Sequence, residues 1–232
     1  MKNQYVGDIR DFEKYAVLNA LSAASGLSVV LCWMLTPNDA GQDGRKLKYL
    51  ERPDDYRHLN ADVFDRLSKV INDNQRSVEA IRTAQVIADA TYYEPVLADS
   101  LTARASYMNG LWGIAETPSL MCFDPDNGIE VASVRKGNKR SSKYIYLDEL
   151  ADAYARGHSL VVFHHWGRYK KDEYLDDMLP RLKTTCGLNH DPFAIYSSGA
   201  AFVILAQSEH NAQLATAGET LTDQWAPKLT HR

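Results

Sequence analysis

Residues 119–128 read SLMCFDPDNG, and this stretch decides the fold. The first five residues are nearly all apolar, and a short apolar run bounded by turn formers is typical of a strand buried on both faces. Pro125, Asn127 and Gly128 favour turns and therefore predict a sharp end to this strand. A strand covered on both faces needs helices above and below it, which is the arrangement of an α/β protein.

Two further apolar segments share this pattern, and helical segments separate all three. Residues 27–35 read LSVVLCWML and residues 159–163 read SLVVF, and a polar loop follows each of them. Apolar residues at helical spacing predict helices over 10–24, 61–72, 76–88, 98–115, 147–156 and 170–183, while residues 192–206 predict a hairpin or two late strands. We therefore expect a mostly parallel central sheet with helices on both faces, a Rossmann-like three-layer sandwich.

The composition is that of an ordinary globular protein, with 45% hydrophobic and 24% charged residues. The 232 residues fit one α/β domain, which we place at 1–208, followed by a polar C-terminal tail at 209–232 that is either a helix or partly disordered. The net charge of −4 excludes a basic nucleic-acid coat protein, although single segments can still be basic. Cys32, Cys122 and Cys186 lie too far apart for a CxxC metal motif and give no disulfide framework.

No leader or membrane segment is visible in the sequence. Charged residues rather than an apolar run follow Met1–Gln4. No stretch reaches the roughly 18 consecutive apolar residues that a membrane-spanning helix needs. We expect a cytoplasmic protein that has no membrane contact and no obligate protein partner.

Polar residues follow each of the three strands, and the carboxyl ends of parallel strands meet at one edge of a sheet. After the central strand come Asp124 and Asp126, two carboxylates suited to stabilise positive charge, activate water or bind a metal, with Asn127 beside them for substrate. The simpler alternative is a tight turn, because Asp, Pro, Asn and Gly all form turns. The loop after the first strand could bind a nucleotide or a base edge through its polar and charged residues Asn38, Asp39, Gln42, Asp43, Arg45 and Lys46.

The third strand runs into residues 163–168, which read FHHWGR. A histidine at this edge can act as an acid, a base or a hydrogen-bond donor near neutral pH. Adjacent residues of a strand point to opposite faces, and we favour His165 as the histidine that faces the site. Trp166 could stack on a base, and Arg168 could contact the substrate. The alternative is a pair of loop histidines with a packed tryptophan.

A basic segment follows the acidic loop. Residues 135–143 contain five cations and no acid, with glycine, asparagine and serine between them: Arg135, Lys136, Lys139, Arg140 and Lys143. Lysine and arginine bind phosphates through their charge, and the backbone amides of glycine and serine can approach an anion. The segment therefore predicts binding of nucleic-acid phosphates, with a solvated flexible loop as the alternative.

The strand that runs into Asp-Pro and the later strand that ends in histidine resemble the site of the uracil-DNA glycosylase superfamily. This resemblance implies that Asp124 orients a water and stabilises the sugar cation, and that His165 hydrogen-bonds the departing base. It also implies that Trp166 and Arg168 enter the DNA. In size and general character the chain is similar to bacterial anti-phage glycosylases that excise glucosylated hydroxymethylcytosine.

The order of segments is also similar to that of the bacterial ribosomal-RNA adenine N6-methyltransferases. Residues 7–15 are similar to a Gly-Asn-x-x-Asp-x-x-Lys-His stretch of that family through Gly7-Asp8, Asp11 and Lys14-Tyr15, and Asp124–Asn127 to its Asp-Pro-Pro-Tyr. This similarity implies binding of S-adenosylmethionine, although residues 32–37 read CWMLTP where that family has a glycine-rich cofactor loop. The simpler alternative for residues 7–15 is a capped helix start.

A glycosylase needs a flipped nucleotide, a carboxylate near the sugar carbon, a donor to the leaving base and phosphate contacts, but no cofactor. The sequence therefore predicts a DNA glycosylase that hydrolyses the N-glycosidic bond of a modified base flipped out of DNA, with a role in anti-phage defence. The alternatives are a methyltransferase-like protein, an inactive nucleic-acid-binding module and a metal-dependent nuclease. The nuclease would use Asp124, Asp126 and His165 with Mg²⁺.

Overall fold

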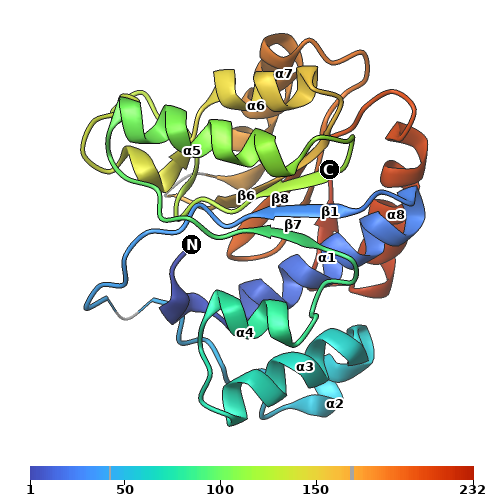
Figure 1. Ribbon diagram of the computed structural model, residues 1–232. Helices are drawn as coiled ribbons and strands as arrows, with labels where there is room; N and C mark the ends of the chain where they lie inside the picture. Colours follow the sequence, from blue (N-terminus) through green and yellow to red (C-terminus); the bar gives the residue numbers. More distant parts are fainter. Residues whose placement is uncertain (42, 168–169) are drawn as a thin grey trace.

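The structure is a computed structural model, and it describes residues 1–41, 43–167 and 170–232. The described residues form a seven-stranded central sheet in the order β2-β1-β3-β6-β8-β7-β9, which confirms the predicted α/β fold (Figure 1). The strands are β1 (Val29–Cys32), β2 (Thr91–Tyr93), β3 (Leu120–Phe123), β6 (Ser159–His165), β7 (Phe193–Tyr196), β8 (Ala200–Leu205) and β9 (Thr230–His231). β2, β1, β3 and β6 pair in parallel, whereas β8 is antiparallel to both β6 and β7.

Helices cover both faces of this sheet, as expected from its almost wholly apolar strands (Figure 1). Residues of β1 alternate between the two faces, with Val29 and Leu31 in one core cluster and Val30 and Cys32 in the other. The first cluster joins the sheet to α1 (Ile9–Ser25), α3 (Ala61–Asn72), α4 (Val78–Thr83) and α8 (Asn211–Gln224). The second joins it to α5 (Leu101–Ile114), α6 (Leu147–Ala155) and α7 (Lys171–Cys186). Burial of apolar area on both faces therefore stabilises a three-layer arrangement.

Local signals in the sequence place the helix ends. Asp8 caps α1 by accepting a hydrogen bond from the backbone N–H of Arg10 at 3.1 Å, and Gly26 ends the helix in the left-handed region at φ 70°. Ser100 caps α5 in the same way through the backbone N–H of Ala103. A short helix α2 (Pro53–Tyr56) begins at a proline, where the missing N–H costs nothing. These signals explain why most helices lie close to their predicted ranges.

The segment 209–232, predicted as a polar tail outside the domain, is part of the same fold. Its residues form α8, which packs along α1, and β9, which pairs with β7. Trp225, just after α8, is 1% exposed, and its ring centroid lies 5.0 Å from that of Phe12. Leu214, Leu221 and Trp225 are spread thinly through this polar sequence yet share one buried face, which is why the segment packs on the sheet domain.

Two very short strands form a separate parallel pair beside the main sheet. These are β4 (Gly128–Ile129) and β5 (Tyr144–Ile145), which flank the basic segment. The pairing brings residue 127 next to residue 143, because the backbone N–H of Asn127 donates to the carbonyl of Lys143 at 2.9 Å. Across the described residues, no helix has the length and apolar character required to cross a membrane.

The chain order creates a crevice at the carboxyl ends of β1 and β3. After β1 the chain adds β2 on one side and then returns to add β3 on the other. In doubly wound sheets, ligands bind where the strand order reverses in this way. The register sets Cys32 beside Phe123 and Phe123 beside Val162, so the loops after β1, β3 and β6 emerge close together.

Candidate functional site

A cavity of about 520 Å³ lies at this edge of the sheet. Five parts of the chain line it: the N-terminal residues with the first turns of α1, residues within 39–41 and 43–46, the loop after β3, the end of β6 with Trp166, and the turn between β7 and β8. Residue 143 from the basic segment completes the wall. The loops after β1, β3 and β6 were predicted to meet at one edge of the sheet, and residues from all three line this cavity.

A buried triad of charges forms the floor of the cavity. The Lys14 ammonium lies 2.7 Å from Oδ2 of Asp124 and 2.9 Å from Oδ1 of Asp11. Asp11 is fixed in turn by the backbone N–H of Gly7, which donates to its Oδ2 at 2.9 Å. Lys14 is 1% and Asp124 2% exposed. Through the 2.7 Å contact, a buried lysine on α1 therefore orients the carboxylate that follows β3.

The surroundings of Lys14 keep it charged. Burial alone would lower its pKa, but the Asp11 and Asp124 carboxylates outweigh burial and raise the pKa above its ordinary value. The rings of Tyr15, Trp33 and Phe163 also surround the ammonium, with centroids 5.2 to 5.4 Å from Nζ. Burial raises the pKa of Asp11, and Lys14 counteracts part of that rise. In this triad, Asp11 and Asp124 therefore lie on either side of one charged lysine.

Asp126 is held by a second set of cations. Its Oδ1 lies 2.7 Å from the Met1 ammonium, and its Oδ2 accepts a hydrogen bond from the Thr36 hydroxyl at 2.8 Å. Lys2 and Lys143 lie 3.6 and 3.8 Å from the same oxygen. Burial works to raise the pKa of Asp126, but the Met1 ammonium and these neighbours lower it below its ordinary value. Asp126 is therefore an ionised anchor for the loop and a weak base.

The predicted substrate-binding residues of the first two loops divide into two groups. Asn127 and Asp39 line the cavity, whereas Asn38 is not among its lining residues. Asp39 is paired with Lys2 at 2.5 Å, and this contact lowers its pKa to about 2. The Asn38 side chain instead accepts a hydrogen bond from the backbone N–H of Gln4 at 3.2 Å, so it anchors the chain around Lys2.

The two histidines at the end of β6 face opposite sides. His165 lines the cavity, as predicted, and its pKa is lowered by burial, with the Asp124 carboxylate opposing that shift. His164 points to the other face, where its Nδ1 accepts a hydrogen bond from the backbone N–H of Ile129 at 3.2 Å. Burial lowers the pKa of His164 to about 4, so both rings are neutral at pH 7.

Trp166 also lines the cavity, but its indole is already engaged. Its Nε1–H donates to the carbonyl of Ser197 at 2.9 Å, and its ring meets that of Tyr196 edge-on at 5.8 Å. Its position is thus fixed by the β7–β8 turn. Arg168, the other residue predicted to contact substrate in this segment, lies outside the described residues, as does Gln42 of the loop after β1.

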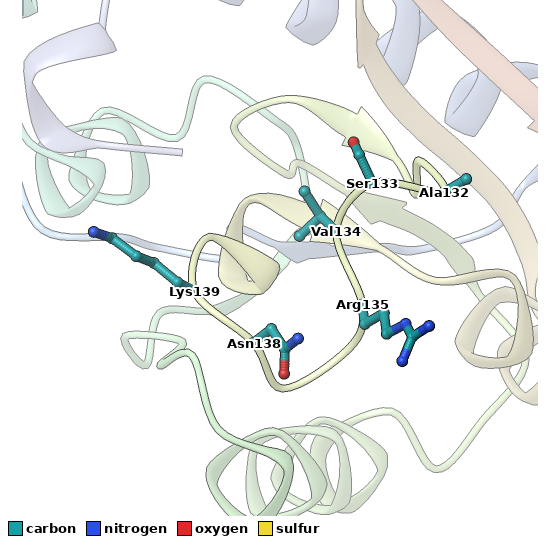
Figure 2. A pocket seen from close by; sticks show the side chains of 6 residues that line it. All are labelled: Ala132, Ser133, Val134, Arg135, Asn138 and Lys139. Atoms are coloured by element: carbon teal, nitrogen blue, oxygen red, sulfur yellow. The ribbon is translucent and has the colours of Figure 1, made fainter.

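The structure divides the basic segment. Lys143 enters the cavity wall, and Lys136 is neutralised by Asp148 at 2.5 Å and Glu149 at 3.5 Å. Arg135 and Lys139, together with Arg140, are exposed. A separate hollow of about 580 Å³ lies against this loop, and Figure 2 shows Arg135 and Lys139 pointing to different sides of it. The cations therefore form a basic surface and do not converge on one anion.

Two charged residues of α1 shape the site: the methyltransferase resemblance of residues 7–15 includes Lys14, whereas no sequence pattern singled out Arg10. Besides Lys14, these include Arg10, which lines the cavity and donates to both oxygens of Glu13 at 2.6 Å and to the Ser197 hydroxyl at 2.6 Å. The available signal was the spacing of Arg10 with Glu13 and of Asp11 with Lys14, three residues apart, within an otherwise apolar helix. That spacing predicts that the charges are paired, but it does not show whether the pairs lie on the buried or the solvated face of the helix.

The described residues contain no group of three or more His, Cys, Asp or Glu side chains that could hold a metal ion. The buried Asp124 carboxylate can stabilise a developing positive charge beside it, and a neutral histidine and a tryptophan lie on the wall. No protein-family model matches the sequence, and no curated protein is significantly similar to it.

Proposed function

We propose that this protein is a DNA glycosylase that hydrolyses the N-glycosidic bond of a modified base flipped into the cavity, with a role in anti-phage defence. The observation that carries the proposal is the buried Asp124 carboxylate at the cavity floor, oriented by Lys14 at 2.7 Å. Rupture of an N-glycosidic bond develops positive charge on the sugar, and a fixed carboxylate stabilises that charge. The cavity of about 520 Å³ falls in the size range of small-ligand sites and suits one flipped nucleotide.

The bond between the sugar C1′ and the base nitrogen breaks, and its electron pair leaves with the base. Asp124 stabilises the resulting sugar cation, and a water oxygen then adds to C1′ and releases one proton. The base takes up a proton, so the products are the free base and an abasic site. His165 is neutral at pH 7 because burial lowers its pKa, and its ring can hydrogen-bond the departing base.

The proposal is tested by incubating the protein with a panel of DNAs that carry different base modifications, with unmodified DNA as the control. Released base is measured by mass spectrometry, and abasic sites are converted to strand breaks with alkali. Base release from one or more modified DNAs is the expected result. Absence of release across the panel contradicts the proposal, as do breaks that form without alkali and disappear with EDTA.

Methyl transfer from S-adenosylmethionine is the second candidate, because one observation favours it. The cavity opens at the reversal of strand order between β1 and β3, where doubly wound sheets bind nucleotide cofactors. Calorimetric titration with S-adenosylmethionine separates the two candidates. A saturable heat of binding favours the methyltransferase, and a flat titration together with base release favours the glycosylase.

A further inference from the structure

Two cations at the rim of the cavity are free to bind a ligand. Arg45 and Lys46 line the cavity from the loop segment 43–46, and both are exposed. Within residues 1–41, 43–167 and 170–232, neither side chain forms a salt bridge within 4.0 Å. The cations deeper in the cavity differ, because Lys2 is bound to Asp39, Arg10 to Glu13, and Lys14 to Asp11 and Asp124.

The backbone that carries these two cations is fixed on both sides. The N–H of Lys46 donates to Oδ2 of Asp8 at 2.9 Å, and its carbonyl accepts from the N–H of Ile9 at 3.2 Å. Gly44 adopts φ +79° against the backbone of Tyr5, and the Arg76 guanidinium donates to the carbonyl of Gly44. The loop therefore presents two exposed cationic side chains from a backbone tied to the start of α1.

We infer that Arg45 and Lys46 bind the phosphates that flank the nucleotide in the cavity, and so position the DNA strand at its mouth. This inference rests on the proposed function. Phosphate contacts fix the register of a protein on DNA, and arginine and lysine supply most of the charge for them. Among the wall residues that the structure describes, Lys143 also has only a distant partner, Asp126 at 3.8 Å. The strand therefore meets positive charge on two segments of the chain.

The test compares the double variant Arg45→Gln/Lys46→Gln with the wild type. Binding of a fluorescein-labelled single-stranded oligodeoxynucleotide is followed by fluorescence anisotropy over a series of salt concentrations. The slope of log K against log salt is negative, and loss of two phosphate contacts to a single strand should reduce its magnitude by about 1.4. Binding at low salt should also become weaker. The control Arg57→Gln/Lys69→Gln removes two exposed cations that are already paired with Asp65 and Asp73, and it should leave the slope unchanged.

An unchanged slope in Arg45→Gln/Lys46→Gln overturns the inference, and so does an equal loss in the control. If the wild type releases base while the slope of the variant is unchanged, the inference alone fails. If the slope falls but the wild type releases no base from the DNA panel, Arg45 and Lys46 remain nucleic-acid contacts and the glycosylase proposal fails. The two failures are therefore distinguishable.

Discussion

Lys14 is the residue on which the candidate site depends, because it joins α1 to the loop after β3. Its ammonium is almost fully buried between two carboxylates. Removing one member of a buried ion pair leaves an uncompensated charge, which costs more than the pair itself contributes. The site therefore tolerates loss of one carboxylate better than loss of the cation, since Asp11 remains 2.9 Å from Lys14 when Asp124 is neutral.

This view predicts the outcome of a double-mutant cycle at Lys14 and Asp124. Lys14→Met should destabilise the protein by about 3–5 kcal/mol, because two buried carboxylates lose their cation. Asp124→Asn should cost less, and the double variant should be more stable than the sum of the single changes by about 0.5–3 kcal/mol. Urea unfolding measures all four free energies. Additive changes would mean that the 2.7 Å contact does not couple the two side chains energetically.

His164 provides a prediction about pH. Its pKa is about 4 in the folded protein against an ordinary value of 6.5, so the unfolded chain binds the proton more readily. Its contribution to stability is present above about pH 6.5 and is lost as the pH falls toward 4. The free energy of unfolding of the wild type should therefore fall by about 3 kcal/mol more than that of His164→Leu between about pH 7 and about pH 4. Urea unfolding across that range checks this, and parallel pH profiles would contradict it.

At the residue scale, simple rules predict the residues at strand ends but not their partners. Asp124 and His165 follow from the convergence of parallel strand ends and from the two-residue period of a strand. Lys14 could not be predicted in the same way, because a charged residue within a helix normally faces solvent and only the tertiary contact reveals its partner. Lys136 was predicted to bind phosphate but is paired with Asp148, and the sequence did not indicate this pairing because Asp148 lies 12 residues away.

At the element scale, the long helices and buried strands follow from periodicity, whereas β2, β4, β5 and β9 do not. Each of these four strands has two or three residues, too few for any pattern to emerge. β4 and β5 exist because their backbone groups pair beside β6. Arg104 supports that pair, because its guanidinium donates to the carbonyls of Ser141 at 3.0 Å and Tyr144 at 2.6 Å.

The two glycines of α5 provide a matched prediction about that helix. A Cβ on Gly113 would meet no atom within 4 Å, so Gly113→Ala should stabilise the protein by about 0.5–1 kcal/mol through helix propensity. A Cβ on Gly110 would collide with the hydroxyl of Tyr93, which donates to the carbonyl of Tyr107 at 2.7 Å. Gly110→Ala should therefore destabilise the protein. Thermal and urea unfolding of the two variants should give opposite signs, and equal signs would contradict the packing of α5 on β2.

At the scale of the whole molecule, the C-terminal segment completes the domain. Trp225 packs on Phe12 of α1, and Leu214 and Leu221 join the same core cluster as the sheet. The packing of this segment could not be predicted from its average polarity, which hides a few well-placed apolar residues. The sandwich could be predicted because three strongly apolar strands were enough to indicate it.

A chain that ends at residue 208 should therefore fail to fold. It loses α8 and β9, which exposes the apolar side of α1 and leaves β7 as an open edge. Circular dichroism with urea unfolding is the measurement, with the full chain as control. A cooperative transition of the truncated chain at a similar urea concentration would show that 209–232 is dispensable.

We propose that the Asp124 carboxylate, at the meeting point of α1 and the sheet, acts on a bound nucleotide. The most direct measurement compares Asp124→Asn with the wild type for base release from modified DNA and, separately, for DNA affinity by fluorescence anisotropy. Asp65→Asn, an exposed carboxylate paired with Arg57, is the control. Base release should fall by roughly 10²-fold or more in Asp124→Asn while DNA affinity stays near that of the wild type, because one charge-stabilising group is lost and the rim cations remain. Undiminished base release by a folded Asp124→Asn variant would show that this carboxylate does not act on the nucleotide.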